Sequence, residues 1–278
     1  EADFPVARHI NENGFYVGCH QDLRQSELDY IAECVGRFFG NKRTKKPEGV
    51  ALILLTDKRH PVGAADIERL PMELFARTIV VDAGLPGPVR TALEARNAMA
   101  IEATDRHPLD VARDAMDREG IDAAVIFPFN GQWDPTDIPR ILMTLNLGYD
   151  MVIASRFMMG GGRKGQRGNI RSLGNRVFNL LADLLFSANL SDSFSAFRGV
   201  RRSHLASIST PGRGLTKFFS LSLEAAKRGW RIQEIPTVEV TRSTSGLIAD
   251  SLATVIPALL ILLREWRSRP EPGPKDRS

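Results

Sequence analysis

Short apolar runs alternate with segments of helical periodicity over most of the chain. The runs are bounded by turn residues, and they lie at Val50–Leu55, Thr78–Asp82, Ala123–Phe127 and Met151–Ala154. Helical stretches are predicted between them, near residues 64–76, 88–99, 108–119 and 136–147. This order predicts an α/β fold in which a mostly parallel sheet is connected by crossover helices.

The later part of the chain continues the pattern. Residues 171–188 have helical spacing, and Ile232–Pro236 and Val238–Thr241 are predicted late strands. Ser251–Trp266 contains the run LATVIPALLILL, which is too short to span a bilayer and is interrupted by Pro257. Two interpretations stay open for it. It is a core-packing terminal helix, or it lies in a membrane interface with the following arginines on phospholipid headgroups.

The N-terminal region is predicted to be a separate unit. Apolar residues at helical spacing indicate a helix over residues 26–39 that ends at Gly40. The basic segment NKRTKKPEG then suits a linker. The predicted organisation is a strand–helix unit (1–40), a linker (41–49), a main domain (50–246), an amphipathic helix (247–269) and a disordered tail (270–278).

Composition and charge narrow the class of protein. The net charge of +4 and the pI of about 9.3 favour an anionic partner. Cys19 and Cys34 give no disulfide framework, which together with the lack of a visible secretion signal predicts a reducing, cytoplasmic setting. The five histidines lack metal-ligand spacing, which argues against a zinc site.

A glycine- and arginine-rich segment follows the fourth apolar run. No acidic residue lies between Asp150 and Asp183, and guanidinium groups in a glycine loop after a strand suit phosphate binding. In parallel sheets, ligands bind at the carboxyl ends of strands. Asp82, the Asn130-Gly131-Gln132 turn and Ser155-Arg156 all follow predicted strands, so we expect them to share one cleft. Few aromatic residues are interleaved with the basic ones, which argues against nucleic-acid binding.

An ordered set of motifs over residues of about 50–267 resembles the family 2 glycosyltransferases of the polyprenyl-phosphate type, similar to dolichyl-phosphate mannosyltransferase. The matching segments are Asp82-Ala83-Gly84, Asn130-Gly131-Gln132-Trp133-Asp134-Pro135, Ala154-Ser155-Arg156-Phe157, Gly160-Gly161, Arg171 with Gly174-Asn175, Asp192-Ser193-Phe194-Ser195-Ala196-Phe197-Arg198, and Glu234-Ile235-Pro236. The resemblance implies a GT-A fold. It also implies inverting transfer of a sugar from a nucleotide sugar to a polyprenyl phosphate at the cytoplasmic face of a membrane.

The resemblance also implies roles for individual residues. Because the acceptor is already an anion, arginines are expected to hold it rather than a base to activate it. The catalytic candidates are Arg156, Arg171 and Arg198. Nucleotide binding is expected of Thr56, Asp57, Asp82, Asn130 and Gln132. Binding of the acceptor phosphate is expected of Arg163, Arg167, Asn175, Ser195, Arg202 and Arg242.

The donor side departs from the family pattern. The position of the family's DxD motif reads Pro128-Phe129-Asn130, and the acid expected after the first strand is replaced by Lys58. A hard divalent cation prefers carboxylate oxygens, so Mg²⁺ or Mn²⁺ binding at Asn130 and Gln132 is expected to be weak or absent. Two explanations stay open: a metal-independent enzyme in which Lys58 or the arginine loop neutralises the diphosphate, and a non-catalytic scaffold that binds an anionic lipid or a partner.

Residues of about 4–39 resemble the C-terminal end of a DegT/DnrJ-type sugar aminotransferase. The segment Gly14-Phe15-Tyr16-Val17-Gly18-Cys19-His20 before the predicted helix carries this resemblance. The body of that fold and its pyridoxal-binding lysine are missing, so no pyridoxal phosphate site is expected in this chain. The alternative is a plain helical extension that docks on the main domain.

Overall fold

The computed structural model describes residues 47–57, 62–103, 106–164, 169–186, 188–206, 212–240 and 247–267. The chain divides into two units, Glu1–Arg43 and Thr44–Ser278, and all the described residues belong to the second. The division falls inside the predicted linker at 41–49. The predictions for the 26–39 helix, the aminotransferase-like segment and the tail at 270–278 lie outside the described residues.

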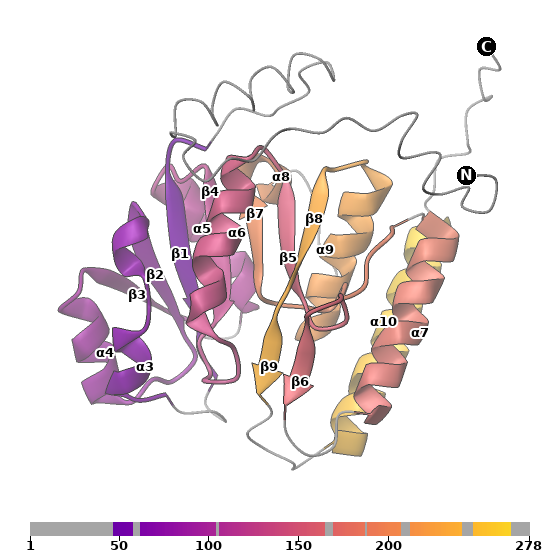
Figure 1. Ribbon diagram of the computed structural model, residues 1–278, viewed down its shortest axis with the longest axis horizontal. Coiled ribbons are helices and arrows are strands. Elements are labelled where there is room, and N and C mark those ends of the chain that lie inside the picture. The colour runs from indigo at the N-terminus through magenta and orange to yellow at the C-terminus, as the bar shows by residue number, and fades with distance from the viewer. Residues whose placement is uncertain are drawn as a thin grey trace, which may run out of the picture. The chain divides into compact units, whose positions relative to one another are not determined.

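A seven-stranded sheet forms the centre of the second unit (Figure 1). Its order is β3-β2-β1-β4-β7-β5-β8, and its pairs are parallel except where β7 runs antiparallel between β4 and β5. The mostly parallel sheet is therefore confirmed. The strands are β1 (Val50–Leu55), β2 (Arg77–Asp82), β3 (Ala98–Glu102), β4 (Ala123–Pro128), β5 (Met151–Ser155), β7 (Arg198–Arg201) and β8 (Ile232–Pro236). A second, two-stranded sheet pairs β6 (Gly162–Lys164) with β9 (Val238–Val240).

Helices cover both faces of the large sheet, so the adjacent central strands β1 and β4 are apolar at every position. In β1, for example, Ala51 and Ile53 face one core and Leu52 and Leu54 face the other. The helices of the first core are α5 (Pro108–Arg118), α7 (Asn169–Phe186), α8 (Arg202–Ala206), α9 (Leu215–Lys227) and α10 (Leu247–Arg267). Those of the second are α3 (Ala64–Glu68), α4 (Gly87–Glu94) and α6 (Ile138–Asn146), with 3₁₀ turns at Met72–Leu74 and Pro135–Asp137.

Two predicted helices are shorter in the structure. The helix expected over 64–76 is divided into α3 and a 3₁₀ turn that begins after Pro71. The helix expected over 88–99 ends at Glu94, because Asn97 adopts a φ of 62° and Ala98–Glu102 then pairs with β2. This edge strand has only Ala98 fully buried, and so it lacks the apolar run that marks the other strands.

The antiparallel strand β7 has the sequence Arg198-Gly199-Val200-Arg201 and is buried at all four positions. Its polar composition is not typical of a buried strand. Glycine is required at position 199 because the packing leaves no room for a side chain. A Cβ at this position would lie 2.7 Å from side-chain carbons of Ile141 and Leu145 in the helix packed above it.

Helix α10 packs its inner side on the core, where Ala258, Ile261 and Leu262 are buried. Pro257 lies within the helix. Of the two interpretations of this segment, core packing is therefore confirmed for the inner side of the helix, while its outer side is apolar and exposed. Within the described residues, no helix combines the length and the apolar content needed to cross a membrane.

Candidate active-site cleft at the carboxyl ends of the strands

The turns after β1, β2 and β4 are joined by hydrogen bonds at one edge of the sheet. Thr56 Oγ1 donates to the carbonyl of Val81 at 3.2 Å and accepts from the backbone N–H of Ala83 at 2.8 Å. The N–H of Phe129 donates to the carbonyl of Leu55 at 2.8 Å. Topology brings the donor-side segments together as expected, and Thr56 and the partly buried Asp57 lie among them.

Asp82 is only 6% exposed and is held from three directions. It accepts hydrogen bonds from the N–H groups of Gly84 and Leu85 at 2.6 and 2.7 Å, and from Arg90 Nη2 at 2.5 Å. Burial alone would raise the pKa of Asp82, but these hydrogen bonds and the charge of Arg90 outweigh it and lower the pKa. The carboxylate therefore organises the turn before α4, which leaves it little capacity for a nucleotide.

The Asn130–Gln132 turn offers amide oxygens instead of carboxylates. The N–H of Gln132 donates to Asn130 Oδ1 at 3.1 Å, and Asn130 Nδ2 donates to Gln132 Oε1 at 3.3 Å. The nearby Asp134 caps the following turn and pairs with Arg69 at 2.9 Å. The part of the chain that the structure describes holds no group of three His, Cys, Asp or Glu residues suited to a metal ion. The amide oxygens of this turn are ligands that a hard divalent cation prefers less than carboxylate oxygens.

Arg156 is a buried cross-link between three segments. Its Nε and Nη2 bind the two oxygens of Asp192 at 2.6 and 2.7 Å, and Nη1 binds Glu239 at 3.0 Å. The guanidinium carbon lies 5.4 Å from the ring centroid of Trp133. Burial opposes the charge of Arg156, but the two carboxylates outweigh burial and raise its pKa. The guanidinium that is expected to hold an acceptor phosphate is therefore already bound by two carboxylates in this structure.

Arg198 is fully buried and has a structural set of partners. Its guanidinium donates to the backbone carbonyls of Ser193, Ser195 and Phe218 and to Ser222 Oγ. Burial lowers the pKa of Arg198 to about 9. Contact with a substrate is excluded for Arg198 and for the buried Ser195, because both are enclosed by protein.

The other acceptor-side candidates fall in different places. Arg202 pairs with Asp117 and Asp122 at 3.6 and 3.9 Å, and Asp122 precedes β4, so Arg202 lies at the opposite end of the sheet from the cleft. This corrects its expected role. Asn175 is partly buried on α7. Arg163 lies in β6 and Arg171 in α7, with side chains that are not described, and Arg167, Arg242 and Lys58 lie outside the described residues.

Several residues of the site had no role in the predictions. Glu234 accepts from the N–H and Oγ of Ser191 and from the N–H of Asp192, and burial raises the pKa of this carboxyl group. Glu239 lies in β9 and forms an isolated antiparallel bridge with Trp133, which no sequence motif indicates. Arg176 of α7 lies with its guanidinium carbon 5.8 Å from the ring centroid of Phe157.

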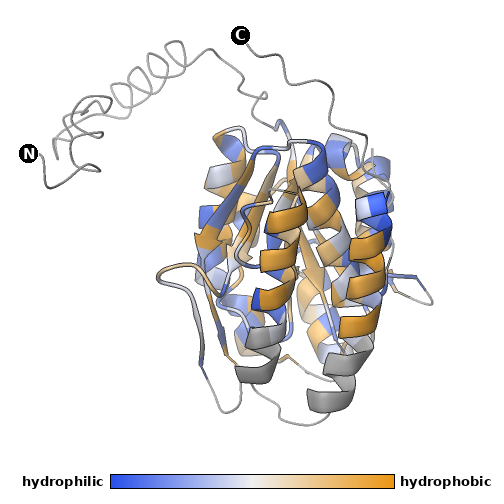
Figure 2. Cartoon of the chain, turned by 90° about the vertical axis from the view of Figure 1, so that its right-hand side faces the viewer, coloured by the Kyte–Doolittle hydropathy of each residue, from blue (hydrophilic) through white to orange (hydrophobic). Residues whose placement is uncertain are grey.

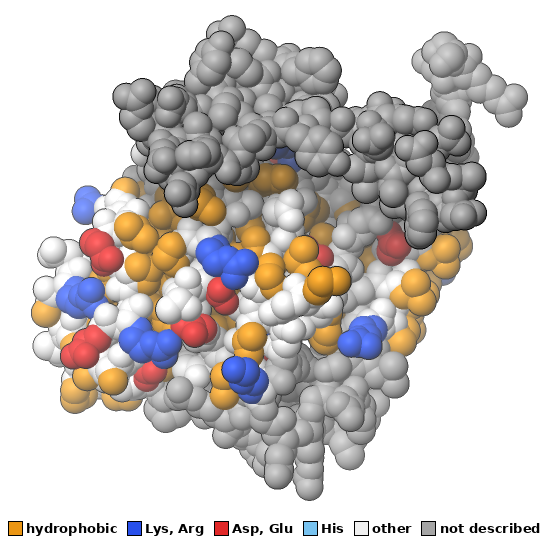
Figure 3. Space-filling view, viewed as in Figure 1, with side chains coloured by type: hydrophobic (Ala, Val, Ile, Leu, Met, Phe, Trp, Pro, Cys, Tyr) orange, Lys and Arg blue, Asp and Glu red, His pale blue; other side chains and the backbone are white. Residues whose placement is uncertain are grey.

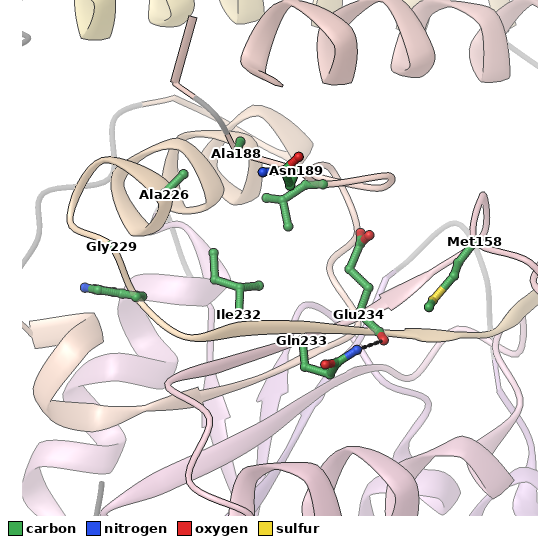
Figure 4. A pocket seen from close by; sticks show the side chains of 10 residues that line it. Met158, Ala188, Asn189, Ala226, Gly229, Ile232, Gln233 and Glu234 are labelled. Carbon is green, nitrogen blue, oxygen red and sulfur yellow. Dashed lines mark hydrogen bonds between the residues drawn. The ribbon is translucent and has the colours of Figure 1, made fainter. Parts of the chain in front are cut away.

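A cavity of about 410 Å³ follows the edge strand β8 (Figure 4). Met158, from the loop after β5, lies towards one end of it, and Gly229 lies beyond Ile232 towards the other. Trp230 also lines the cavity. Among the described residues, the ten that line it include no lysine or arginine.

Comparison with known proteins agrees with this architecture. Glucosyl-3-phosphoglycerate synthase from Mycobacterium tuberculosis, in complex with Mn²⁺, UDP and phosphoglyceric acid, superposes with a TM-score of 0.61 and 16% identity over 92% of this chain and 86% of that one. The same enzyme in complex with phosphoglyceric acid gives a TM-score of 0.60 and 15% identity over 90% and 86% of the two chains. The chain has a GT-A fold.

Sequence similarity points to the same class of protein. The chain is 25% identical over 198 residues to glycosyltransferase AglJ from Haloferax volcanii. The match covers 70% of this chain and 64% of AglJ, so it spans just under two thirds of that relative's length. No protein-family model matches the chain.

Proposed function

We propose that the chain is a glycosyltransferase that moves a sugar from a nucleotide sugar to a polyprenyl phosphate at the cytoplasmic face of a membrane. The observation that carries the proposal is the cleft edge of a GT-A sheet, at which the turns after β1, β2 and β4 are joined by hydrogen bonds. The similarity to AglJ supports the same class of activity.

The proposed reaction is a single displacement. An oxygen of the acceptor phosphate attacks the anomeric carbon, and the bond from that carbon to the donor diphosphate breaks. The nucleoside diphosphate leaves with the electron pair, and the configuration inverts. Because the nucleophile is an anion, the protein has to position it and offset its charge rather than remove a proton. The candidates for this task are the basic residues of the 163–176 segment.

A phosphate-bearing acceptor is consistent with the named complexes of the structural relative. Glucosyl-3-phosphoglycerate synthase binds phosphoglyceric acid, a small phosphorylated acid, whereas we propose a lipid phosphate for this chain. Both molecules carry a phosphate group, and a transfer assay that offers each of them with a radiolabelled donor separates the two as acceptors for this chain. Label in the organic phase supports a lipid acceptor, and label confined to phosphoglycerate would contradict it.

One observation favours a second candidate, a non-catalytic scaffold of the same fold. The donor side offers Pro128, Asn130 and Gln132 where a metal-dependent enzyme would offer carboxylates. Such a protein would bind an anionic lipid or a partner without transferring sugar.

Calorimetry with UDP- and GDP-sugars, in EDTA and in Mn²⁺, separates these candidates. We expect a donor to bind in EDTA, because the Asn130–Gln132 turn does not supply a metal site. The variant N130D, which adds one carboxylate, is expected to make binding more dependent on Mn²⁺. Donor binding by the native chain that requires Mn²⁺ would contradict this account of the donor side. Absence of binding in both conditions would favour the scaffold.

A further inference from the structure

Hydrophobic residues are concentrated along α7 and α10 (Figure 2), and several of their side chains are exposed. Leu180 and Leu184 of α7 are 68% and 77% exposed, and Ile256 and Leu260 of α10 are 60% and 61% exposed. The two helices pack against each other, so their outward rows lie side by side (Figure 1). We call this surface the α7–α10 face and define it by Val177, Leu180, Leu184, Ile256, Leu259 and Leu260.

The core does not account for this face, because each helix already buries its opposite side. Phe178, Ala182 and Phe186 of α7 are in the core, as are Ala258 and Ile261 of α10. Soluble monomers seldom expose large contiguous apolar surfaces, and those that do use them for binding. The side of the molecule seen in Figure 3 differs, because acidic and basic side chains are interspersed there.

The charges beside the face are basic. Arg176 precedes Val177, and Arg264 and Arg267 are exposed in the last turn of α10 together with the half-exposed Trp266. Two acidic side chains are described on these helices, and both have partners within the protein. Asp183 accepts from the N–H of Asn189, and the buried Glu265 binds Lys227 Nζ at 2.6 Å.

We propose that the α7–α10 face docks on the surface of an anionic lipid bilayer. Leucine and isoleucine side chains would enter the boundary between headgroups and acyl chains, Trp266 would lie at the headgroup level, and the arginines would meet lipid phosphates. Charge favours a bilayer over a second copy of this chain. A two-fold dimer through this face would bring the arginines of both copies together, and the described acidic groups of the two helices are already engaged.

Docking in this way connects the bilayer to the cleft. Arg176 stacks on Phe157, and Phe157 directly follows Arg156 at the end of β5. A lipid phosphate held at this end of the face would therefore lie beside the acceptor side of the site. This part of the inference rests on the proposed function, whereas docking itself does not require transfer.

Vesicle co-sedimentation of the full chain tests the docking surface. The paired variant L180E/L184E is expected to weaken binding to vesicles of phosphatidylcholine and phosphatidylglycerol by on the order of tenfold for each leucine. The matched control M143E/L147E changes two exposed apolar residues at α6, and we expect binding like that of the native chain. Thermal melting checks that both variants fold. Native-like sedimentation of a folded L180E/L184E would overturn the proposal.

The arginines are tested separately with the paired variant R264Q/R267Q. R118Q, on α5, is its control. The first pair is expected to weaken binding to anionic vesicles, to leave the weaker binding to pure phosphatidylcholine unchanged, and to reduce the loss of binding as salt is raised. Analytical ultracentrifugation tests whether the α7–α10 face instead binds a second copy of this chain. A dimer that L180E/L184E dissociates, together with no vesicle binding by the native chain, would overturn docking in favour of self-association.

Donor calorimetry without vesicles separates the two proposals. A chain that binds vesicles but no nucleotide sugar would contradict the proposed function and leave docking standing. A chain that binds donor but no vesicles would contradict docking alone.

Discussion

Replacing Arg156 with methionine should lower the free energy of unfolding by about 3–5 kcal/mol, the usual cost of removing one partner from a buried ion pair. Arg156 is 6% exposed and Asp192 is fully buried, so water would not replace the lost guanidinium. The substitution removes three side-chain hydrogen bonds to Asp192 and Glu239 and leaves both carboxylates without their shared cation. Since single domains are stable by about 5–15 kcal/mol, the loss would be a large share of the total.

Urea denaturation followed by circular dichroism measures this loss, and D114N is the matched control. Asp114 pairs with Arg106 at 2.6 Å, but that pair is exposed, and its removal should cost about 1 kcal/mol or less. The double variant R156M/D192N should recover part of the loss, because a neutral amide is less costly to bury than a carboxylate. A loss for R156M no larger than that for D114N would refute the assignment of Arg156 as a buried cross-link.

The remaining predictions concern the turn at Asp82 and the close packing of β7. R90Q removes two hydrogen bonds to Asp82 and a charge, and these lower the pKa of Asp82 in the native chain. A depressed carboxyl pKa adds stability at pH values above the unfolded pKa, and that stability is lost as pH falls through the folded pKa. R90Q should therefore be less stable than the native chain at neutral pH, and urea denaturation over a pH series should show the two converging as pH falls below the ordinary range for Asp. G199A should lose about 1–3 kcal/mol through overpacking against Ile141 and Leu145, measured by thermal melting. Its control G174A, in α7 with open space around the new methyl group, should gain roughly 0.5–1 kcal/mol, and equal effects of the two substitutions would contradict the packing argument.

The sequence predicted the elements that are marked by strong local patterns. β1 and β4 are apolar at every position, and β2 and β5 contain the apolar runs Ile79–Val81 and Met151–Ala154, because helices cover both faces of the sheet. These runs stand out in the sequence. No element was predicted over α9, since its buried Thr216, Lys217, Ser220 and Ser222 interrupt the apolar spacing.

The sequence predicted where the residues of the candidate site lie, but it did not predict which groups their side chains contact. That Asp82, Asn130 and Arg156 follow strands of one sheet is a consequence of topology, and the structure agrees. Motif spacing carries no information about which group a guanidinium binds. The sequence therefore could not distinguish the saturated Arg156 and the buried Arg198 from arginines that face the cleft.

The two ion pairs of Arg156 affect which acceptor the candidate site can bind. One guanidinium faces the carboxylates of Asp192 and Glu239, so the formal charges at this point are one positive and two negative. A phosphate brought against this cluster would be repelled, and we propose that arginines of the 163–176 segment attract it instead. Arg176 belongs to that segment and begins the apolar row of Val177, Leu180 and Leu184 on α7. A ligand that meets both features has a phosphate head and a hydrocarbon tail, which a polyprenyl phosphate supplies and a small phosphorylated acid does not. R176Q should accordingly weaken transfer to a lipid phosphate while leaving donor affinity unchanged, and a fall in donor affinity instead would place Arg176 on the donor side.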